Sequence, residues 1–295
     1  DVVIGISGHH VNAVNSHGIV GIRNKEVTTA DVDRVIEAAK AIAIPDNETV
    51  LHTLPQEFIV DNQSGVMKPV GMSGVRLEAR VLMLRAASSA LQNLTKCVEF
   101  CGLRVKQIIA QQLAASRSVL SGDERNLGVC LLDIGGGTTD IVLCKQRSLT
   151  YVSSVPIAGG HVTNDIAVAL RTPPKSAETT KVAHGRILSR GYEGGKNISV
   201  ESLSNQSTQK VSVQLLAEVM EARYQEIFSF VKKDLREKGL LGSMPGGIVL
   251  TGGGAKVPGL IDFAGRVFNC QVRLAEPKVA LKERSLRDAR YAAPI

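Results

Sequence analysis

The sequence predicts an α/β fold, and its 295 residues suit either two domains or one large divided domain. Hydrophobic residues make up 44% of the chain, which is enough to bury a sizeable core. Short apolar runs alternate with segments of helical periodicity after about residue 85. Residues 133–140 place three glycines between the apolar runs Gly128–Leu132 and Ile141–Cys144, which is typical of two antiparallel strands joined by a tight turn.

Charge and cysteine content narrow the class of protein. The net charge is +7, yet aromatic residues are only 3% of the chain, tryptophan is absent, and lysines and arginines are scattered. We therefore expect a solvated surface and no nucleic-acid partner, with association to acidic partners as an alternative. No window of eighteen apolar residues predicts a transmembrane helix, and the amino terminus lacks a signal-peptide pattern. Five cysteines without a CxxC pair favour a reduced, cytosolic protein.

The two ends of the sequence favour a piece of a longer protein. Asp1 leads at once into the β-branched run Val2–Gly8, with no initiator methionine. At the other end, Tyr291–Ile295 stop without a capping helix or a polar tail. We expect that an amino-terminal segment and the natural carboxyl terminus lie outside this chain.

Residues 15–83 are expected to form a compact α+β unit. Thr28-x-x-Asp31 is a capping box with Asp in place of Glu, and apolar residues then recur at helical spacing up to Pro45. The other elements predicted in this unit are strands at Thr49–Leu54, Glu57–Asp61 and Leu77–Leu84, and a loop rich in Gly, Pro and Ser at Ser64–Gly74.

An α/β repeat follows this unit. Its predicted elements are the helix Ala87–Phe100 closed by Gly102, the strand Val105–Ile109, the helix Gln112–Leu120, the strand Leu149–Val155, the helix Val162–Leu170, short strands or a mobile loop across Gly185–Lys210, and the helix Val213–Lys238. The last of these helices has one broad apolar face with Glu and Lys opposite.

The glycine hairpin carries the first chemical signal. Gly135, Gly136 and Gly137 let the main chain bring its N–H groups close to a phosphate, since no Cβ intervenes. Asp133 can hold the water shell of a Mg²⁺ ion, and the Thr138 hydroxyl adds a neutral donor. The alternative is a plain glycine-rich hairpin, which does not explain an acid at one end and Thr-Thr-Asp at the other.

A second glycine corner follows the buried strand Ile248–Leu250. Gly252, Gly253 and Gly254 come next, and Pro258 is expected to open the following helix, where its missing N–H costs nothing. Strand, glycine turn and helix N-terminus together predict an anion or nucleotide contact. The alternative is a tight strand-to-helix turn, but two glycine corners in one chain favour the nucleotide hypothesis for both.

Several ordered motifs carry a resemblance to a known family. Asp133-Ile-Gly-Gly-Gly-Thr138, then Ile157-Ala-Gly-Gly160 with Asp165 on the next helix, then Val249-Leu-Thr-Gly-Gly-Gly254, resemble the motif order of the actin-like ATPases. Further motifs resemble the FtsA family of actin-like bacterial cell-division proteins: Val50-Leu-His-x-Leu-Pro-Gln-Glu57, Gly71-x-Ser-Gly-Val-Arg76, Leu120-Ser-Gly-Asp-Glu-Arg125, Thr172-Pro-Pro174 and Ala177-Glu178-x-x-Lys181-x-x-His184-Gly185. The resemblance covers nearly the whole chain.

The resemblance implies an actin-like, ribonuclease H-like fold of two lobes that clasp ATP. The implied divisions are a first-lobe remnant at 1–14, the inserted α+β subdomain at 15–83, the rest of the first-lobe core at 84–126, the second-lobe core with the phosphate loop at 127–171, a small second-lobe subdomain at 172–243 and the core with the adenosine loop at 244–295. Actin-like folds carry a second phosphate hairpin in the first lobe. Its absence here implies weaker ATP binding by this chain.

The resemblance also assigns roles to residues. The phosphate loop of the family matches Gly135, Gly136, Gly137 and Thr138, and its Mg²⁺-water position matches Asp133. The residues that contact the ribose and adenine match Glu178 and Lys181, and the adenosine loop matches Gly252, Gly253 and Gly254. A water-orienting position matches Gln111. For Gln111 the alternative is a polar helix start. For Glu178 and Lys181 the alternative is a solvated pair on one helix face.

The function implied by the resemblance is a division scaffold. Such a protein binds ATP with slow or absent hydrolysis, polymerises into protofilaments, contacts other division proteins and tethers FtsZ through the FtsZ carboxyl-terminal tail. It lies in the cytoplasm on the inner face of the inner membrane at the division site, held by a carboxyl-terminal helix that this chain lacks. Arg223 and Glu226 match the subdomain that receives the tail; the alternative is an exposed charge pair.

Two other functions remain as alternatives. One is a pilus-assembly relative with a similar fold and a different tail partner. The other is an enzyme, either a phosphotransferase of the sugar-kinase branch or a cycling ATPase. A sugar kinase needs an aspartate base in a cleft between the lobes, and no acid outside the phosphate loop has suitable neighbours in the sequence.

Overall fold

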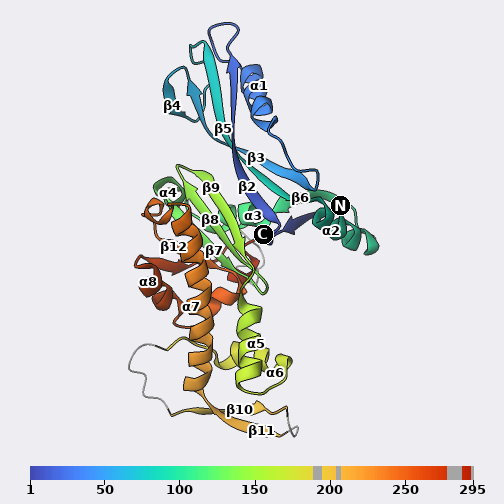
Figure 1. Cartoon of the computed structure of the whole chain (residues 1–295), viewed down its shortest axis with the longest axis vertical. Coiled ribbons are helices and arrows are strands. Elements are labelled where there is room, and N and C mark those ends of the chain that lie inside the picture. The colour runs from blue at the N-terminus through green and yellow to red at the C-terminus, as the bar shows by residue number, and fades with distance from the viewer. Residues whose placement is uncertain (189–194, 204–206, 278–287, 294–295) are drawn as a thin grey trace.

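The computed structural model describes residues 1–188, 195–203, 207–277 and 288–293. A five-stranded sheet lies in the middle of the molecule, a four-stranded sheet at one end and a two-stranded hairpin at the other, as Figure 1 shows. A fourth, two-stranded sheet lies beside the amino terminus. In the described ranges, no helix combines the length and the apolar character needed to cross a membrane.

The four-stranded sheet has the antiparallel order β2-β5-β3-β4 and is covered by helix α1. Its elements are β2 (Val11–Gly21), α1 (Thr29–Lys40), β3 (Glu48–Val60), β4 (Gln63–Val66) and β5 (Arg76–Ala87). The predicted capping box is present, since Thr28 and Asp31 each bond the other's main-chain N–H. Gly18 allows α1 to approach closely, because a Cβ there would lie 2.2 Å from the Val35 carbonyl oxygen.

Three predictions for this unit are wrong. The strands Thr49–Leu54 and Glu57–Asp61 are one strand, β3, because Pro55 lies where the register shifts and the strand continues past it. The expected loop Ser64–Gly74 starts inside a short strand, β4. The long strand β2 was not predicted at all, because its exposed asparagines and histidine and its half-buried serine hide its alternation.

The amino-terminal sheet pairs β1 (Val2–Ile6) in parallel with β6 (Val105–Ala110). Helices α2 (Ser88–Phe100) and α3 (Gln111–Val119) flank β6 at nearly the predicted bounds, and the short helix α4 (Gly122–Leu127) follows. His52 links this region to β3, since its Nε2 accepts a hydrogen bond from the Ala110 N–H over 3.1 Å.

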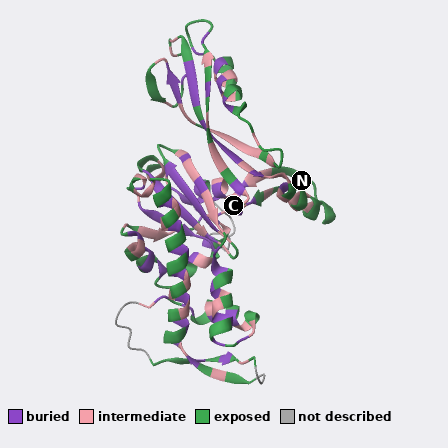
Figure 2. Ribbon diagram, in the orientation of Figure 1, coloured by how far each residue is buried: buried purple, intermediate pink, exposed green. Residues whose placement is uncertain are grey.

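The five-stranded sheet has the order β13-β12-β7-β8-β9. Its antiparallel part is β7 (Val129–Ile134), β8 (Thr139–Lys145) and β9 (Ser148–Val155), and its parallel part adds β12 (Ile248–Thr251) and β13 (Val272–Leu274). One face of the sheet, which includes Val129 and Leu131, packs against α3. The other face, which includes Leu132 and Ile134, packs against α5, α7 and α8. This sheet is the most continuously buried part of Figure 2.

The helices that follow β9 are α5 (Gly159–Ala169), α6 (Pro174–His184), α7 (Val213–Glu237) and α8 (Leu260–Phe268), with 3₁₀ turns η1 (Leu241–Ser243), η2 (Gly253–Lys256) and η4 (Ala289–Tyr291) in the described ranges. Within Gly185–Lys210, where short strands or a mobile loop were predicted, β10 (Asn197–Glu201) pairs with β11 (Thr208–Ser212), while 189–194 and 204–206 lie outside the described residues. Pro258 does not open α8 as predicted, because α8 begins at Leu260 and its N-cap is Gly259, with φ +83. Cys130 and Cys144 are buried, and the thiols are free, as expected.

Candidate functional site

The glycine hairpin is formed as predicted. β7 and β8 are antiparallel, and the turn closes with a 3.0 Å hydrogen bond from the Gly135 N–H to the Thr138 carbonyl oxygen. Gly136 and Gly137 are exposed, and a Cβ on either would meet no atom within 4 Å. The main chain at the tip of the hairpin is therefore open to a ligand.

The amino terminus of α5 lies directly on this hairpin. The N–H groups of Gly159 and Gly160 donate to the carbonyl oxygens of Gly135 and Gly136 over 3.0 and 2.7 Å. A Cβ on Gly160 would lie 2.8 Å from the Gly136 oxygen, so the contact requires glycine. The main chain at the start of α5 therefore lies directly against the main chain of the hairpin, and the positive end of the α5 dipole is beside the hairpin.

The second glycine corner packs on the end of β7. Gly252 has φ +87, and a Cβ there would lie 2.3 Å from Asp133 Oδ1 and 2.5 Å from the Ile134 oxygen. A Cβ on Gly254 would lie 2.6 Å from Ile134 Cγ2. The Tyr224 hydroxyl on α7 donates to the Gly254 oxygen over 2.7 Å. Glycines are therefore needed here for close packing against the hairpin strand.

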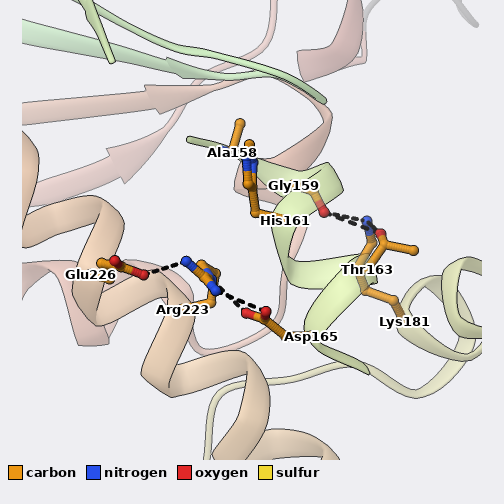
Figure 3. A network of polar contacts seen from close by, with 8 residues as sticks. All are labelled: Ala158, Gly159, His161, Thr163, Asp165, Lys181, Arg223 and Glu226. Carbon is orange, nitrogen blue, oxygen red and sulfur yellow. Dashed lines mark hydrogen bonds and ion pairs between the residues drawn. The ribbon is translucent and has the colours of Figure 1, made fainter. Parts of the chain in front are cut away.

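Helix α6 brings Glu178 and Lys181 to the same place. Lys181 Nζ lies 3.0 Å from the Gly159 oxygen, 2.7 Å from Thr163 Oγ1 and 2.7 Å from Glu178 Oε2, and Figure 3 shows its bonds to Gly159 and Thr163. Burial raises the pKa of Glu178, but the hydrogen bonds from Lys181 and Thr163 outweigh it and leave the pKa below its ordinary value. Glu178 is therefore a stable carboxylate beside the start of α5.

These segments line one pocket of about 800 Å³. Six of the predicted residues are among its lining: Gly135, Gly136, Glu178, Lys181, Gly253 and Gly254. Gly137, Thr138 and Gly252 belong to the same turns but do not line it. Two lining cations, Lys256 and Arg290, were not predicted from the sequence, and both pair with Asp288. No local signal marks Arg290, because only tertiary packing brings its stem over Gly253.

Asp133 lies on the opposite face of the sheet from Ile134, together with Asp140, its partner in register on β8. Burial raises the pKa of Asp133 to about 7, and the charge of Asp140 adds to this effect. Burial also raises the pKa of Asp140 to about 6, although Ser154 and Gln112 oppose the shift. Asp140 Oδ1 has no hydrogen-bond partner in the described part of the chain.

The two glutamines at the start of α3 point to different places. Gln111, the predicted water-orienting residue, lies over Gly5 of β1, where a Cβ would be 2.8 Å from its Cγ. Gln112 is buried beside Asp140, and both atoms of its amide lack a partner among the described residues. Sequence reasoning missed Gln112, because neighbouring residues on a helix differ by about 100° in direction. The role of Gln111 stays a prediction.

Arg223 and Glu226 lie apart from the pocket lining. Arg223 on α7 bonds Asp165 of α5, with Nη2 to Oδ1 at 2.8 Å, and also bonds the Glu226 carboxylate (Figure 3). The hydrogen bond to Asp165 raises the pKa of Arg223. The predicted partner-binding pair is thus part of a three-residue ion network that joins two helices.

Comparisons with known proteins place the chain in a family. A model described as "SHS2 domain inserted in FTSA" matches residues 8–84, and one described as "Cell division protein FtsA" matches residues 130–295. The chain belongs to the FtsA family of cell division proteins.

FtsA of Pseudomonas aeruginosa is 49% identical over 274 residues, which cover 93% of this chain and 66% of the relative. FtsA of Escherichia coli strain K12 is 42% identical over 283 residues, which cover 94% and 67%. The chain therefore spans about two thirds of the length of these FtsA relatives.

Solved structures establish the actin-like fold that FtsA was expected to have. MreB5 of Spiroplasma citri bound to ADP matches with TM-score 0.55 and 23% identity, covering 70% of this chain and 63% of that one. A PilM–PilN type IV pilus biogenesis complex matches with TM-score 0.63 and 16% identity, covering 99% and 76%. At these identities the likeness shows the fold alone. The finer division of this chain into subdomains at residues 15, 84, 127, 172 and 244 stays a prediction.

Proposed function

We propose that the pocket between the two glycine corners binds ATP. The observation that carries this proposal is convergence: the hairpin, the start of α5, the Glu178–Lys181 pair and the corner after β12 all line one pocket of about 800 Å³. The open main chain at Gly136 and Gly137 and the positive end of the α5 dipole suit phosphates, and glycines at 253 and 254 leave room for a flat base. The MreB5 relative in fold is bound to ADP, which supports the same ligand class here.

The residues present also fit Mg²⁺. Asp133 and Asp140 place a half-buried and a buried carboxyl group side by side, and one Asp140 oxygen has no partner in the described ranges. Such a pair needs a cation or its water shell to be ionised together. Asp133 would hold that shell, and Asp140 would add negative charge beside it. When bound, Mg²⁺ would neutralise charge on the phosphate oxygens.

The biological role that follows is a cell-division scaffold. We infer that ATP binding biases the arrangement of the two lobes and thereby filament assembly, with hydrolysis slow or absent. Membership of the FtsA family supports the division role, and the fold neighbour that forms the "MamK double helical filament" supports polymerisation. Binding to FtsZ, to other division proteins and to the inner face of the inner membrane belongs to this proposal.

The FtsZ tail is proposed to bind near Arg223 and Glu226. The supporting feature is the half-buried Arg223 guanidinium on α7, which binds two carboxylates, and a carboxylate of an acidic peptide could replace the more exposed of them, Glu226. The pilus-assembly alternative has only fold-level support, because its neighbour is 16% identical.

Titration of Mg²⁺-ATP against the chain and its Gly136→Asp variant tests the nucleotide site. A carboxylate at the hairpin tip should repel the phosphates and lower affinity at least tenfold. Gly136→Ala controls for the side chain, and Gly122→Asp adds the same charge at another open glycine, on α4. Equal affinity of wild type and Gly136→Asp would overturn the proposal, and phosphorylation of a sugar would favour the kinase alternative.

A further inference from the structure

A second concave surface follows helix α7 on the outside of the molecule. It is a groove of about 790 Å³, and α8 forms its wall beside the carboxyl-terminal half of α7, where Lys232 Nζ donates to the Val267 oxygen over 2.7 Å. Both helices lie at the surface in Figure 1. Its lining shares no residue with the nucleotide pocket.

A polar stripe of α7 makes up one side of this groove. Its residues recur every three or four positions: Gln214, Glu218, Glu221, Gln225, Ser229, Lys232 and Arg236. A different stripe of α7, which includes Met220 and Tyr224, packs into the core. Arg223 and Glu226 do not line the groove, and on the helix they point about 160° and about 100° away from the centre of the polar stripe. The groove is therefore separate from the proposed FtsZ-tail site.

The charges of the groove are segregated along its length. Glu218 and Glu221 lie toward the amino-terminal end of α7, whereas Lys232, Lys233 and Arg236 lie toward the other end, next to Arg266 of α8. Across the described ranges, neither Arg236 nor Arg266 forms an ion pair, and Lys233 reaches Glu237 only at 3.9 Å. Unpaired guanidinium groups present fork-shaped donors that match carboxylates.

The groove also has an apolar floor. Ala217 and Phe263 are buried at its base, and Leu188 and Val267 are half-exposed in its lining. The Arg266 guanidinium lies 5.6 Å from the centre of the Phe263 ring, which holds the cation beside this floor. An apolar side chain of a ligand could therefore be buried next to a bound carboxylate.

We propose that this groove binds an extended acidic peptide from a partner protein. The stripe from Gln214 to Arg236 spans about 33 Å, the length of about ten extended residues. Carboxylates at one end of the peptide meet Arg236 and Arg266, an apolar side chain covers the floor, and a neutral or basic end lies beside Glu218 and Glu221. This inference is independent of the nucleotide site.

Fluorescence anisotropy with a designed panel of ten-residue peptides tests it, at 0.15 M salt. Each peptide carries aspartates at one end, leucine or phenylalanine in the middle and serines at the other end, so that its net charge is negative; in a second panel lysines replace the aspartates. We expect the double variant Arg236→Glu with Arg266→Glu to bind the best peptide at least tenfold more weakly than wild type. Lys96→Glu with Lys106→Glu removes equal charge from α2 and β6 and should change affinity less than about twofold.

A sharper test reverses the charge on both the groove and the peptide. The lysine peptide should bind the double variant more tightly than it binds wild type or the Lys96→Glu, Lys106→Glu variant, which has the same net charge as the double variant. Both arginines are exposed, and a thermal melt verifies folding; Arg236→Gln with Arg266→Gln repeats the test without charge reversal. The proposal is overturned if no peptide in the panel distinguishes wild type from the double variant. It is also overturned if the arginines instead govern self-association of the chain in sedimentation.

Discussion

The Tyr224 hydroxyl donates a hydrogen bond to the Gly254 carbonyl oxygen over 2.7 Å, which ties the long helix α7 to the second glycine corner of the nucleotide pocket. Burial raises the pKa of Tyr224, and the charge of Glu178 adds to this, so the hydroxyl stays protonated and able to donate. The centres of the Tyr224 and Phe228 rings are 6.3 Å apart, and the Phe228 ring in turn packs beside that of Phe263 on α8. The position of the corner therefore depends on an aromatic cluster behind it.

Tyr224→Phe should weaken ATP binding about three- to tenfold. The change removes the bond and leaves the Gly254 oxygen without its partner, at a cost of about 1–2 kcal/mol. Isothermal titration with Mg²⁺-ATP measures the effect. Tyr151→Phe is the matched control, because it removes a tyrosine hydroxyl bond to Asp234 away from the pocket. Unchanged affinity in Tyr224→Phe would show that the corner does not depend on this bond.

Gly160→Ala should disrupt the hairpin, and Gly136→Ala should not. A Cβ on Gly160 would lie 2.8 Å from the Gly136 oxygen, whereas a Cβ on Gly136 would meet nothing within 4 Å. Alanine at position 160 should otherwise favour helix α5, so any loss reports the clash. We expect a loss of about 1–3 kcal/mol in the free energy of unfolding, with weaker ATP binding. Urea unfolding of both variants measures the difference, and equal stability would contradict it.

Local chemistry explains which parts of the fold could be predicted from the sequence. The capping box at Thr28 and Asp31 marked the start of α1, because both partners lie within one turn. The hairpin at Gly135–Gly137 was predictable for a similar reason, since its glycines and flanking apolar runs are contiguous. Pro55 misled the prediction of β3, because a proline on a weakly paired stretch beside a register shift does not end a strand.

The parts of the site that were missed depend on packing between distant segments. Lys256 and Arg290 reach the pocket only because η2 and η4 dock together, with the Gly252 N–H bonded to the Ala289 oxygen over 3.1 Å. The choice between Gln111 and Gln112 depends on the exact rotation of α3 against β8. Neither relation leaves a pattern in the sequence.

Glu124 links α4 to β13 and should make stability depend on pH. Its carboxylate caps Ser121 and accepts two bonds from Arg273, at 2.6 and 2.8 Å. Burial raises the pKa of Glu124, but the bonds from Arg273 and Ser121 outweigh it and lower the pKa to about 2. A lowered pKa in the folded state means that this stabilisation is present above the unfolded pKa of about 4.5 and is lost as pH falls toward 2.

Glu124→Gln should therefore destabilise the protein by about 1–2 kcal/mol at pH 7 and by progressively less as pH falls below about 4.5. Urea unfolding of wild type and variant across this range measures the gap. Glu237→Gln, which removes an exposed partner of Lys233, is the control and should show little change at any pH. A gap that stays constant down to pH 2.5 would show that ionisation of Glu124 does not contribute.

Glu226 should compete with an acidic tail peptide for Arg223. Both Asp165 and Glu226 bind the Arg223 guanidinium, but the Glu226 side chain is 46% exposed, against 25% for Asp165, so Glu226 is the easier partner to displace. Glu226→Gln should raise affinity for an FtsZ-tail peptide about two- to fivefold, which is the scale of one exposed ion pair. Arg223→Glu should abolish measurable binding.

Arg236→Glu with Arg266→Glu should leave tail binding unchanged, because those residues lie on another face of α7 and on α8. Weaker binding in Glu226→Gln would instead show that Glu226 contacts the peptide, and loss of tail binding in the double variant would merge the two sites into one.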